Sequence, residues 1–62
     1  MNVELLYQTI REETQKYMEL IEMVGKDHPM TKRYCIRICG MQDAFKVVSG
    51  VSYTDYLISK LS

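Results

Sequence analysis

The sequence has little of what makes turns, membrane spans or nucleic-acid surfaces. It contains three glycines and one proline in 62 residues, so we expect few turns and long elements. No apolar run approaches the ~20 residues of a membrane span, and the first ten residues, MNVELLYQTI, lack the features of a signal peptide. The formal net charge is zero, which removes the general attraction to nucleic acid. We therefore expect a cytoplasmic protein that does not contact a membrane, and the charge disfavours a nucleic-acid partner.

Tryptophan is absent and phenylalanine occurs once, whereas tyrosine and methionine each occur five times. Apolar residues make up 47% of the chain and charged residues 26%, which is typical of a globular protein. We expect residues 1–62 to form a single helical domain. Because so short a chain buries only about 60% of its unfolded surface, it needs very good helix packing or a partner subunit.

A first helix is predicted over residues 3–24, with Asn2 as its N-cap and Gly25 at its end. At about 100° per residue, its apolar side chains fall on one face. That face comprises Val3, Leu6, Tyr7, Ile10, Thr14, Tyr17, Met18, Ile21 and Val24.

A second helix is predicted over residues 29–48. His28 and Pro29 mark its start, because a residue before proline avoids helical backbone and proline suits the first helical position; Thr31 is an alternative cap. Equal lengths and a short connection predict an antiparallel hairpin. Residues 1–24 carry five acids and two bases (−3), and residues 26–49 carry five bases and two acids (+3), which favours this pairing. The expected seam includes Ile10, Tyr17, Ile38 and Phe45.

A short third helix is predicted over residues 53–61, with Ser52 as its cap and Asp55 three positions later. Nine residues do not hold a helix alone in water, so this segment must dock on another element. The predicted fold class is all-α: an antiparallel helical hairpin (about 3–24 and 29–48) plus a short C-terminal helix (about 53–61), assembled as a homo-oligomeric helical bundle.

The second helix has more apolar surface than a hairpin needs. Its main apolar stripe, which faces the first helix, comprises Tyr34, Ile38, Met41, Phe45 and Val48. A second apolar strip, about 120–160° away around the helix, consists of Ile36, Gly40, Ala44 and Val47. Glycine within a helix costs about 0.5–1 kcal/mol relative to alanine and is tolerable where another backbone comes close. The third helix, a second subunit or both could cover this strip. We predict an oligomer interface there, a dimer or higher.

Basic residues crowd the start of the second helix. Arg33 and Arg37 are one turn apart, so their guanidinium groups can converge on an anion near Lys32. His28 and Tyr34 could stack on a base. These five residues are the hypothetical ligand-binding site, for an anionic nucleotide-type molecule. Alternatively, these basic residues balance the charge of the acidic residues on the first helix and form a solvated surface.

Metal binding and catalysis have weaker support. Cys35 and Cys39 share a helix face, but structural zinc requires four ligands and His28 is the only histidine. We expect both cysteines to be reduced and packed as small side chains. No third group orients a Cys–His pair. We therefore predict no metal, no cofactor and no enzyme activity.

The segment AFKVVSGVSYTDYLISKLS reads as helix, short turn, helix, as in a helix-turn-helix DNA-binding module. The candidate recognition helix has only Lys60 as a base and an acid at its start, which makes it a poor reader of a DNA groove. DNA binding therefore ranks below anion binding and is the second alternative function.

The stretches GKDHPMT and GMQDAFKVVSGVSYTDYL resemble small helical proteins of gut Firmicutes, their phages and mobile elements. The resemblance spans most of the chain through its glycine, proline and cap positions, and it implies no particular site residues. Phages encode small helical oligomers that sequester host signalling nucleotides or block host proteins. The predicted function is therefore non-catalytic binding by a small helical oligomer. Its expected partners are a second copy of the chain, a host protein or an anionic small molecule.

Overall fold

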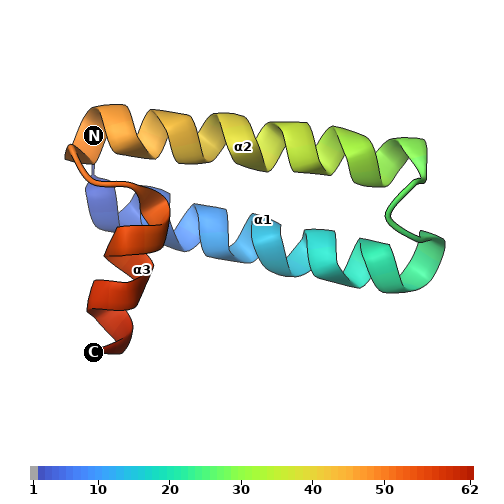
Figure 1. The fold of residues 1–62 in the computed structure, drawn as a ribbon, viewed down its shortest axis with the longest axis horizontal. Coiled ribbons are helices and arrows are strands. Elements are labelled where there is room, and N and C mark those ends of the chain that lie inside the picture. Colours follow the sequence, from blue (N-terminus) through green and yellow to red (C-terminus); the bar gives the residue numbers. More distant parts are fainter. Residues whose placement is uncertain (1) are drawn as a thin grey trace.

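The structure, a computed structural model, describes residues 2–62 and contains three helices. Helix α1 spans Val3–Val24, α2 spans Pro29–Ser49 and α3 spans Tyr53–Leu61. Helices α1 and α2 lie antiparallel, and α3 crosses α1 near the end of the hairpin where the chain begins (Figure 1). The predicted all-α hairpin with a short C-terminal helix is confirmed, and the helix boundaries differ from the predicted ones by at most one residue.

The helices begin and end at the residues whose chemistry favours a boundary. The Asn2 side chain accepts a hydrogen bond from the Leu5 N–H over 3.3 Å. Ser52 Oγ accepts one from the Asp55 N–H over 3.1 Å. Gly50 ends α2 in the left-handed conformation, with φ of 78°, which side chains other than glycine rarely adopt. These local contacts explain why the boundaries could be predicted.

The core lies at the end of the hairpin on which α3 docks. Its buried cluster consists of Tyr7, Ile10, Phe45 and Tyr53. The Phe45 ring meets the Tyr53 ring edge-on, with centroids 5.9 Å apart, and the Tyr56 ring at 5.1 Å. Edge-to-face pairs are favourable because the positive edge of one ring meets the negative face of the other. This aromatic packing gives the nine-residue α3 the docking surface that it needs.

The prediction that the four seam residues are mostly buried is confirmed. Ile10, Ile38 and Phe45 are buried, and Tyr17 is partly buried. Met18, which was predicted on the apolar face of α1, is 56% exposed. Towards the connecting loop the hairpin has only two helices (Figure 1). One facing helix cannot cover the whole of a wide apolar stripe.

Among residues 2–62, no helix combines the length and the apolar character that crossing a membrane requires.

Candidate functional site

The polar groups at the start of α2 are engaged in hydrogen bonds within the chain itself. His28 Nδ1 accepts a hydrogen bond from the Met30 N–H over 3.1 Å, and the His28 carbonyl oxygen accepts one from the Lys32 N–H at the same distance. Thr31 is fully buried, and its Oγ1 donates to the Gly25 carbonyl oxygen over 2.7 Å. The N-cap is therefore His28, and Thr31 pins the loop instead of capping the helix. These hydrogen bonds make His28 a structural residue.

A shallow pocket of about 270 Å³ lies on one flank of α2. Its lining residues are Met30, Arg33, Tyr34 and Arg37. The structure thus brings together three of the five predicted ligand-binding residues, while Lys32 and His28 do not line this pocket. Tyr34 is partly buried, whereas Arg33 and Arg37 are exposed. The pocket combines guanidinium groups with an aromatic ring and a thioether side chain.

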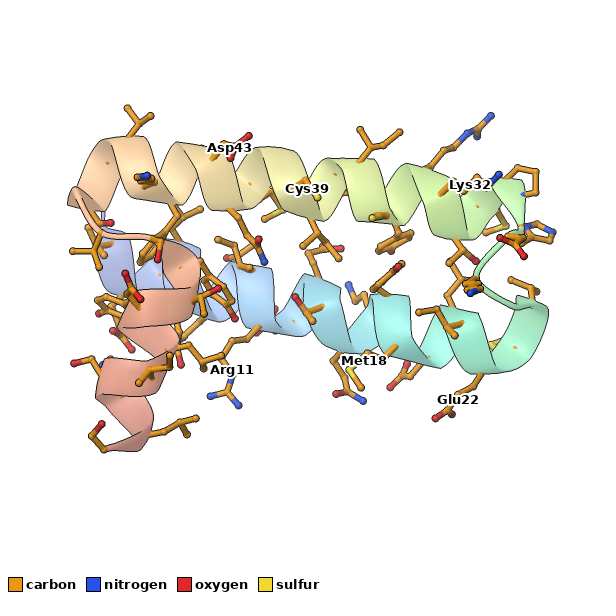
Figure 2. The ribbon with its side chains drawn as sticks, in the orientation of Figure 1. Arg11, Met18, Glu22, Lys32, Cys39 and Asp43 are labelled. Carbon is orange, nitrogen blue, oxygen red and sulfur yellow. The ribbon has the colours of Figure 1, made fainter. Side chains whose placement is uncertain are left out.

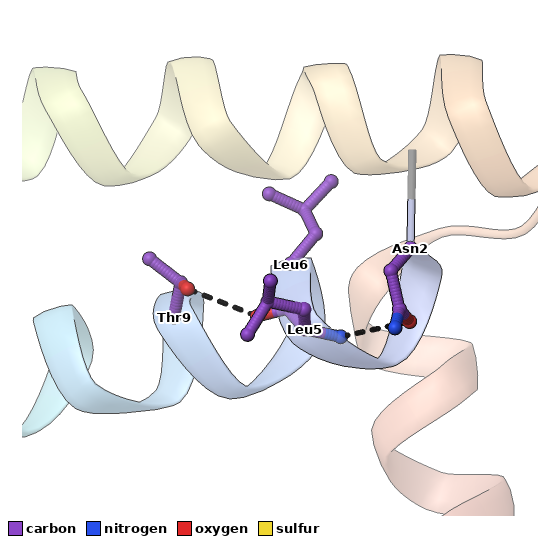
Figure 3. A pocket seen from close by; sticks show the side chains of 4 residues that line it. All are labelled: Asn2, Leu5, Leu6 and Thr9. Atoms are coloured by element: carbon purple, nitrogen blue, oxygen red, sulfur yellow. Dashed lines mark hydrogen bonds between the residues drawn. The ribbon is translucent and has the colours of Figure 1, made fainter.

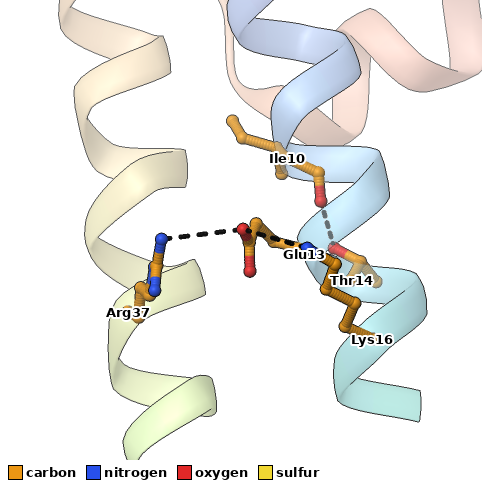
Figure 4. Close-up of polar contacts among 5 residues, drawn as sticks. All are labelled: Ile10, Glu13, Thr14, Lys16 and Arg37. Atoms are coloured by element: carbon orange, nitrogen blue, oxygen red, sulfur yellow. Dashed lines mark hydrogen bonds and ion pairs between the residues drawn. The ribbon is translucent and has the colours of Figure 1, made fainter. Parts of the chain in front are cut away.

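Arg37 is joined to α1 by an ion pair. Its Nη2 atom lies 3.6 Å from Oε1 of Glu13, and Lys16 Nζ lies 4.0 Å from the same oxygen (Figure 4). The Glu13 side chain is only 12% exposed, and its Oε2 atom is buried without a hydrogen-bond partner among residues 2–62. The sequence did not reveal this contact, because its charge pattern predicted that acids of α1 face bases of α2 without specifying pairs.

A smaller hollow of about 180 Å³ lies on α1. Its lining residues are Asn2, Leu5, Leu6 and Thr9 (Figure 3). Its polar groups are engaged locally, since Thr9 Oγ1 donates to the Leu5 carbonyl oxygen over 2.9 Å and the Leu5 N–H donates to Asn2. None of these four residues is charged, so the hollow offers an ionic ligand nothing to bind.

The outer face of α2 carries the predicted apolar strip. Ile36 is 74% exposed and Val47 is 84% exposed, and Gly40 and Ala44 between them are also exposed. Helix α3 packs on the other side of the hairpin and leaves this face open (Figure 1). A Cβ atom at Gly40 would meet nothing within 4 Å. Of the candidates for covering the strip, α3 is thereby excluded.

The two cysteines are free thiols, and both are exposed, so the expectation that they pack as buried small residues is wrong. Figure 2 labels Cys39 on α2. The nearby Cys35 thiolate raises the pKa of Cys39 above its ordinary value, and desolvation adds to the effect. A hydrogen bond with the Cys35 thiol likewise raises the pKa of Tyr17 across the hairpin.

The one basic residue of α3, Lys60, forms an ion pair within the fold. Lys60 Nζ lies 2.8 Å from Glu4 Oε2, and the Tyr56 hydroxyl donates to the same oxygen over 2.7 Å. A lysine held by a carboxylate is poorly placed to contact a DNA phosphate. Nothing in α3 therefore favours the helix-turn-helix alternative.

Within residues 2–62, no group of three or more His, Cys, Asp or Glu side chains is arranged to hold a metal ion. Comparisons of the chain with protein-family models, curated proteins and solved structures found no match. On α2, two surfaces are candidate functional sites: the outer strip and the arginine pocket on its flank.

Proposed function

We propose that this protein is a non-catalytic helical interaction protein that self-associates through the outer face of α2. The exposure of Ile36 and Val47, 74% and 84%, carries this proposal. Burying a large aliphatic side chain contributes about 1.5–3 kcal/mol. A chain this short has few other places to gain stability.

A second copy of the chain fits the pattern of side-chain sizes along the strip. Ile36 and Ala44 lie at equal distances along α2 on either side of Gly40. In an antiparallel pair centred on Gly40, the large Ile36 of one chain lies level with the small Ala44 of the other. Such an isologous contact is self-complementary, which a twofold interface requires. Gly40 at the centre permits close approach of the two helices, because it has no side chain.

Charge at Arg37 does not oppose this pairing, whereas Arg33, which has no carboxylate within ion-pair distance among residues 2–62, remains uncompensated. An antiparallel twofold arrangement brings both copies of Arg37 to the same edge of the interface, where bare cations would repel each other. In each chain, however, Glu13 already lies 3.6 Å from Arg37 and offsets its charge. The ion pair therefore supports a close approach of two α2 helices.

The test is the oligomeric state in solution, measured by sedimentation equilibrium over a series of protein concentrations. One helix face gives an interface at or below the small end of the usual range, about 1,200 Å² in total. We therefore expect a dimer at high micromolar concentration that dissociates on dilution.

Gly40→Leu separates association from folding. In the monomer the new side chain points into open space, and leucine improves helix propensity by about 0.8–1 kcal/mol. We expect this variant to melt no lower than the parent when both are monomeric, and to associate at least about tenfold more weakly. Gln15→Leu adds the same side chain to an exposed position of α1 and should not weaken association. A parent that stays monomeric at high micromolar concentration, or a Gly40→Leu variant that associates like the parent, would overturn the proposal.

A further inference from the structure

We propose that the pocket lined by Met30, Arg33, Tyr34 and Arg37 binds a nucleoside monophosphate, with the phosphate on the arginines and the base on Tyr34. This binding site adjoins the self-association face on α2, because in a pairing centred on Gly40 the Arg33 of one chain lies level with Val47 of the other. Its affinity for a nucleotide is therefore measured in the monomeric Gly40→Leu variant as well as in the parent.

The two guanidinium groups have different surroundings. Arg37 Nη2 lies 3.6 Å from Glu13 Oε1, and this ion pair leaves the other N–H donors of Arg37 for a ligand. Arg33 has no carboxylate within ion-pair distance in the described part of the chain, residues 2–62. A planar guanidinium binds phosphate oxygens in a two-pronged manner. Arg33 therefore supplies the uncompensated charge, and Arg37 supplies a second donor.

The remaining lining residues fit a planar ring. Tyr34 is partly buried, so its ring is held in place, and Met30 is 51% exposed beside it. Stacking of a base on an aromatic side chain contributes about 1–3 kcal/mol, and a thioether packs favourably against ring edges. A volume of about 270 Å³ lies just below the usual lower end for small-molecule sites, about 300 Å³. That size suits a mononucleotide better than a longer nucleic acid.

The site is made of side chains and does not rely on the helix N-terminus. The N–H of Met30 is already bonded to His28, and that of Lys32 to the His28 carbonyl oxygen. Lys32 lies one residue before Arg33 but does not line the pocket. The pocket therefore makes a prediction that a diffuse basic surface does not: Arg33 matters to the ligand much more than Lys32.

The test is calorimetric titration at low salt with three probes: inorganic phosphate, ribose 5-phosphate and AMP. We expect AMP to bind saturably and at least about tenfold more tightly than the two probes that lack a base. Tyr34→Leu should bring AMP down to the affinity of ribose 5-phosphate while phosphate binding stays unchanged. Equal affinity for all three probes, or no binding at millimolar concentration, would overturn the assignment.

Charge variants locate the phosphate. Arg33→Gln should lower AMP affinity at least about tenfold, because Arg33 has the uncompensated charge. Lys46→Gln removes the same charge from the far end of α2 and should leave the affinity within about twofold of the parent. Arg33 is exposed, so its variant should keep the circular-dichroism melting curve of the parent. If Lys46→Gln or Lys32→Gln lost as much affinity as Arg33→Gln, general electrostatic attraction would replace the pocket as the explanation.

Discussion

Glu4 in the first turn of α1 and Lys60 in the last turn of α3 form the shortest ion pair of the described chain, with 2.8 Å between Lys60 Nζ and Glu4 Oε2. Lys60 Nζ also lies 5.9 Å from the centre of the Tyr7 ring and 5.5 Å from that of Tyr56. The Tyr56 hydroxyl donates to the same carboxylate oxygen. One carboxylate therefore holds the free end of α3 through two donors, and we expect docking of α3 to depend on its charge.

Acid should weaken the fold through Glu4. The hydrogen bonds from Lys60 and then from Tyr56 lower the pKa of Glu4 below its ordinary value. A carboxyl with a lowered pKa in the folded state stabilises the fold above its unfolded pKa, and this contribution is lost as pH falls through the folded pKa. We predict that Glu4→Gln melts below the parent at neutral pH, and that the difference disappears in acid.

Thermal melts followed by circular dichroism from about pH 7 to about pH 3 measure this effect. Glutamine keeps a hydrogen-bond acceptor at position 4, so the comparison isolates the charge. Glu22→Gln is the matched control, because Glu22 is exposed at the far end of α1 and points away from the fold (Figure 2). Parallel pH curves for the parent and Glu4→Gln would show that the ion pair does not contribute.

Truncating Phe45 should unfold the domain. Its side chain is fully buried and contacts the rings of Tyr53 and Tyr56. Phe→Ala in a core costs about 3–5 kcal/mol, whereas a chain of this size has a total stability of roughly 3–9 kcal/mol. We expect Phe45→Ala to lose most of its helical circular dichroism or its cooperative melt. Met23→Ala, at a position 79% exposed on α1, should change stability by no more than about 0.5 kcal/mol. A Phe45→Ala variant that melts within a few degrees of the parent would contradict the core assignment.

The sequence predicted the features that depend on local chemistry. Asn2, Ser52 and Gly50 act on backbone groups within four positions of themselves, so the helix boundaries could be read directly. Helical periodicity likewise placed Ile10 and Phe45 in the core. The exposed strip was found for the same reason, because Ile36 and Val47 lie outside the stripe that faces α1.

Features that depend on where α3 docks could not be predicted. Periodicity does not say that α3 crosses α1 at one end of the hairpin, so neither the Glu4–Lys60 pair nor the partial exposure of Tyr17 followed from the sequence. The exposure of Cys35 had the same origin, since a two-helix layer leaves the flanks of α2 open. Cysteine is among the residue types most often buried in proteins. Here the two-helix layer is too thin to bury the cysteines of α2.

Both cysteines should be reactive and dispensable for folding. They are exposed free thiols, so a thiol reagent should titrate both in the native protein, and Cys35→Ser and Cys39→Ser should melt like the parent. Because the Cys35 thiolate raises the pKa of Cys39, the reaction of Cys39 should keep accelerating to higher pH than that of an ordinary thiol. The reaction rate of Cys39 in the parent, followed by mass spectrometry of the labelled peptide, is compared with its rate in Cys35→Ser across a pH series, since removing Cys35 should lower the pKa of Cys39. Two thiols that react only after denaturation, or zinc released in stoichiometric amount by either substitution, would contradict this assignment.

Replacing Glu13 with leucine should stabilise the fold. Oε2 of Glu13 is buried without a hydrogen-bond partner among residues 2–62, and an unsatisfied buried polar group costs about 1–3 kcal/mol. Its other oxygen makes only long ion pairs, 3.6 Å to Arg37 and 4.0 Å to Lys16, with side chains that are 62% and 60% exposed. Exposed partners of this kind contribute about 0–1 kcal/mol, so the loss of the ion pairs is smaller than the relief of desolvation.

We therefore expect Glu13→Leu to raise the melting temperature, by roughly 4–8 °C for each kcal/mol in a domain of this size. Arg37→Met should change the melting temperature in the opposite direction. It removes the cation and keeps the carboxylate, so the melting temperature should fall, because Glu13 would then be buried with only the more distant Lys16 beside it. In the double variant neither charge remains, and its melting temperature should match that of Glu13→Leu. A Glu13→Leu variant that melts below the parent would mean that Oε2 has a partner in solution, such as a bound water, and that Glu13 helps to hold α1 against α2.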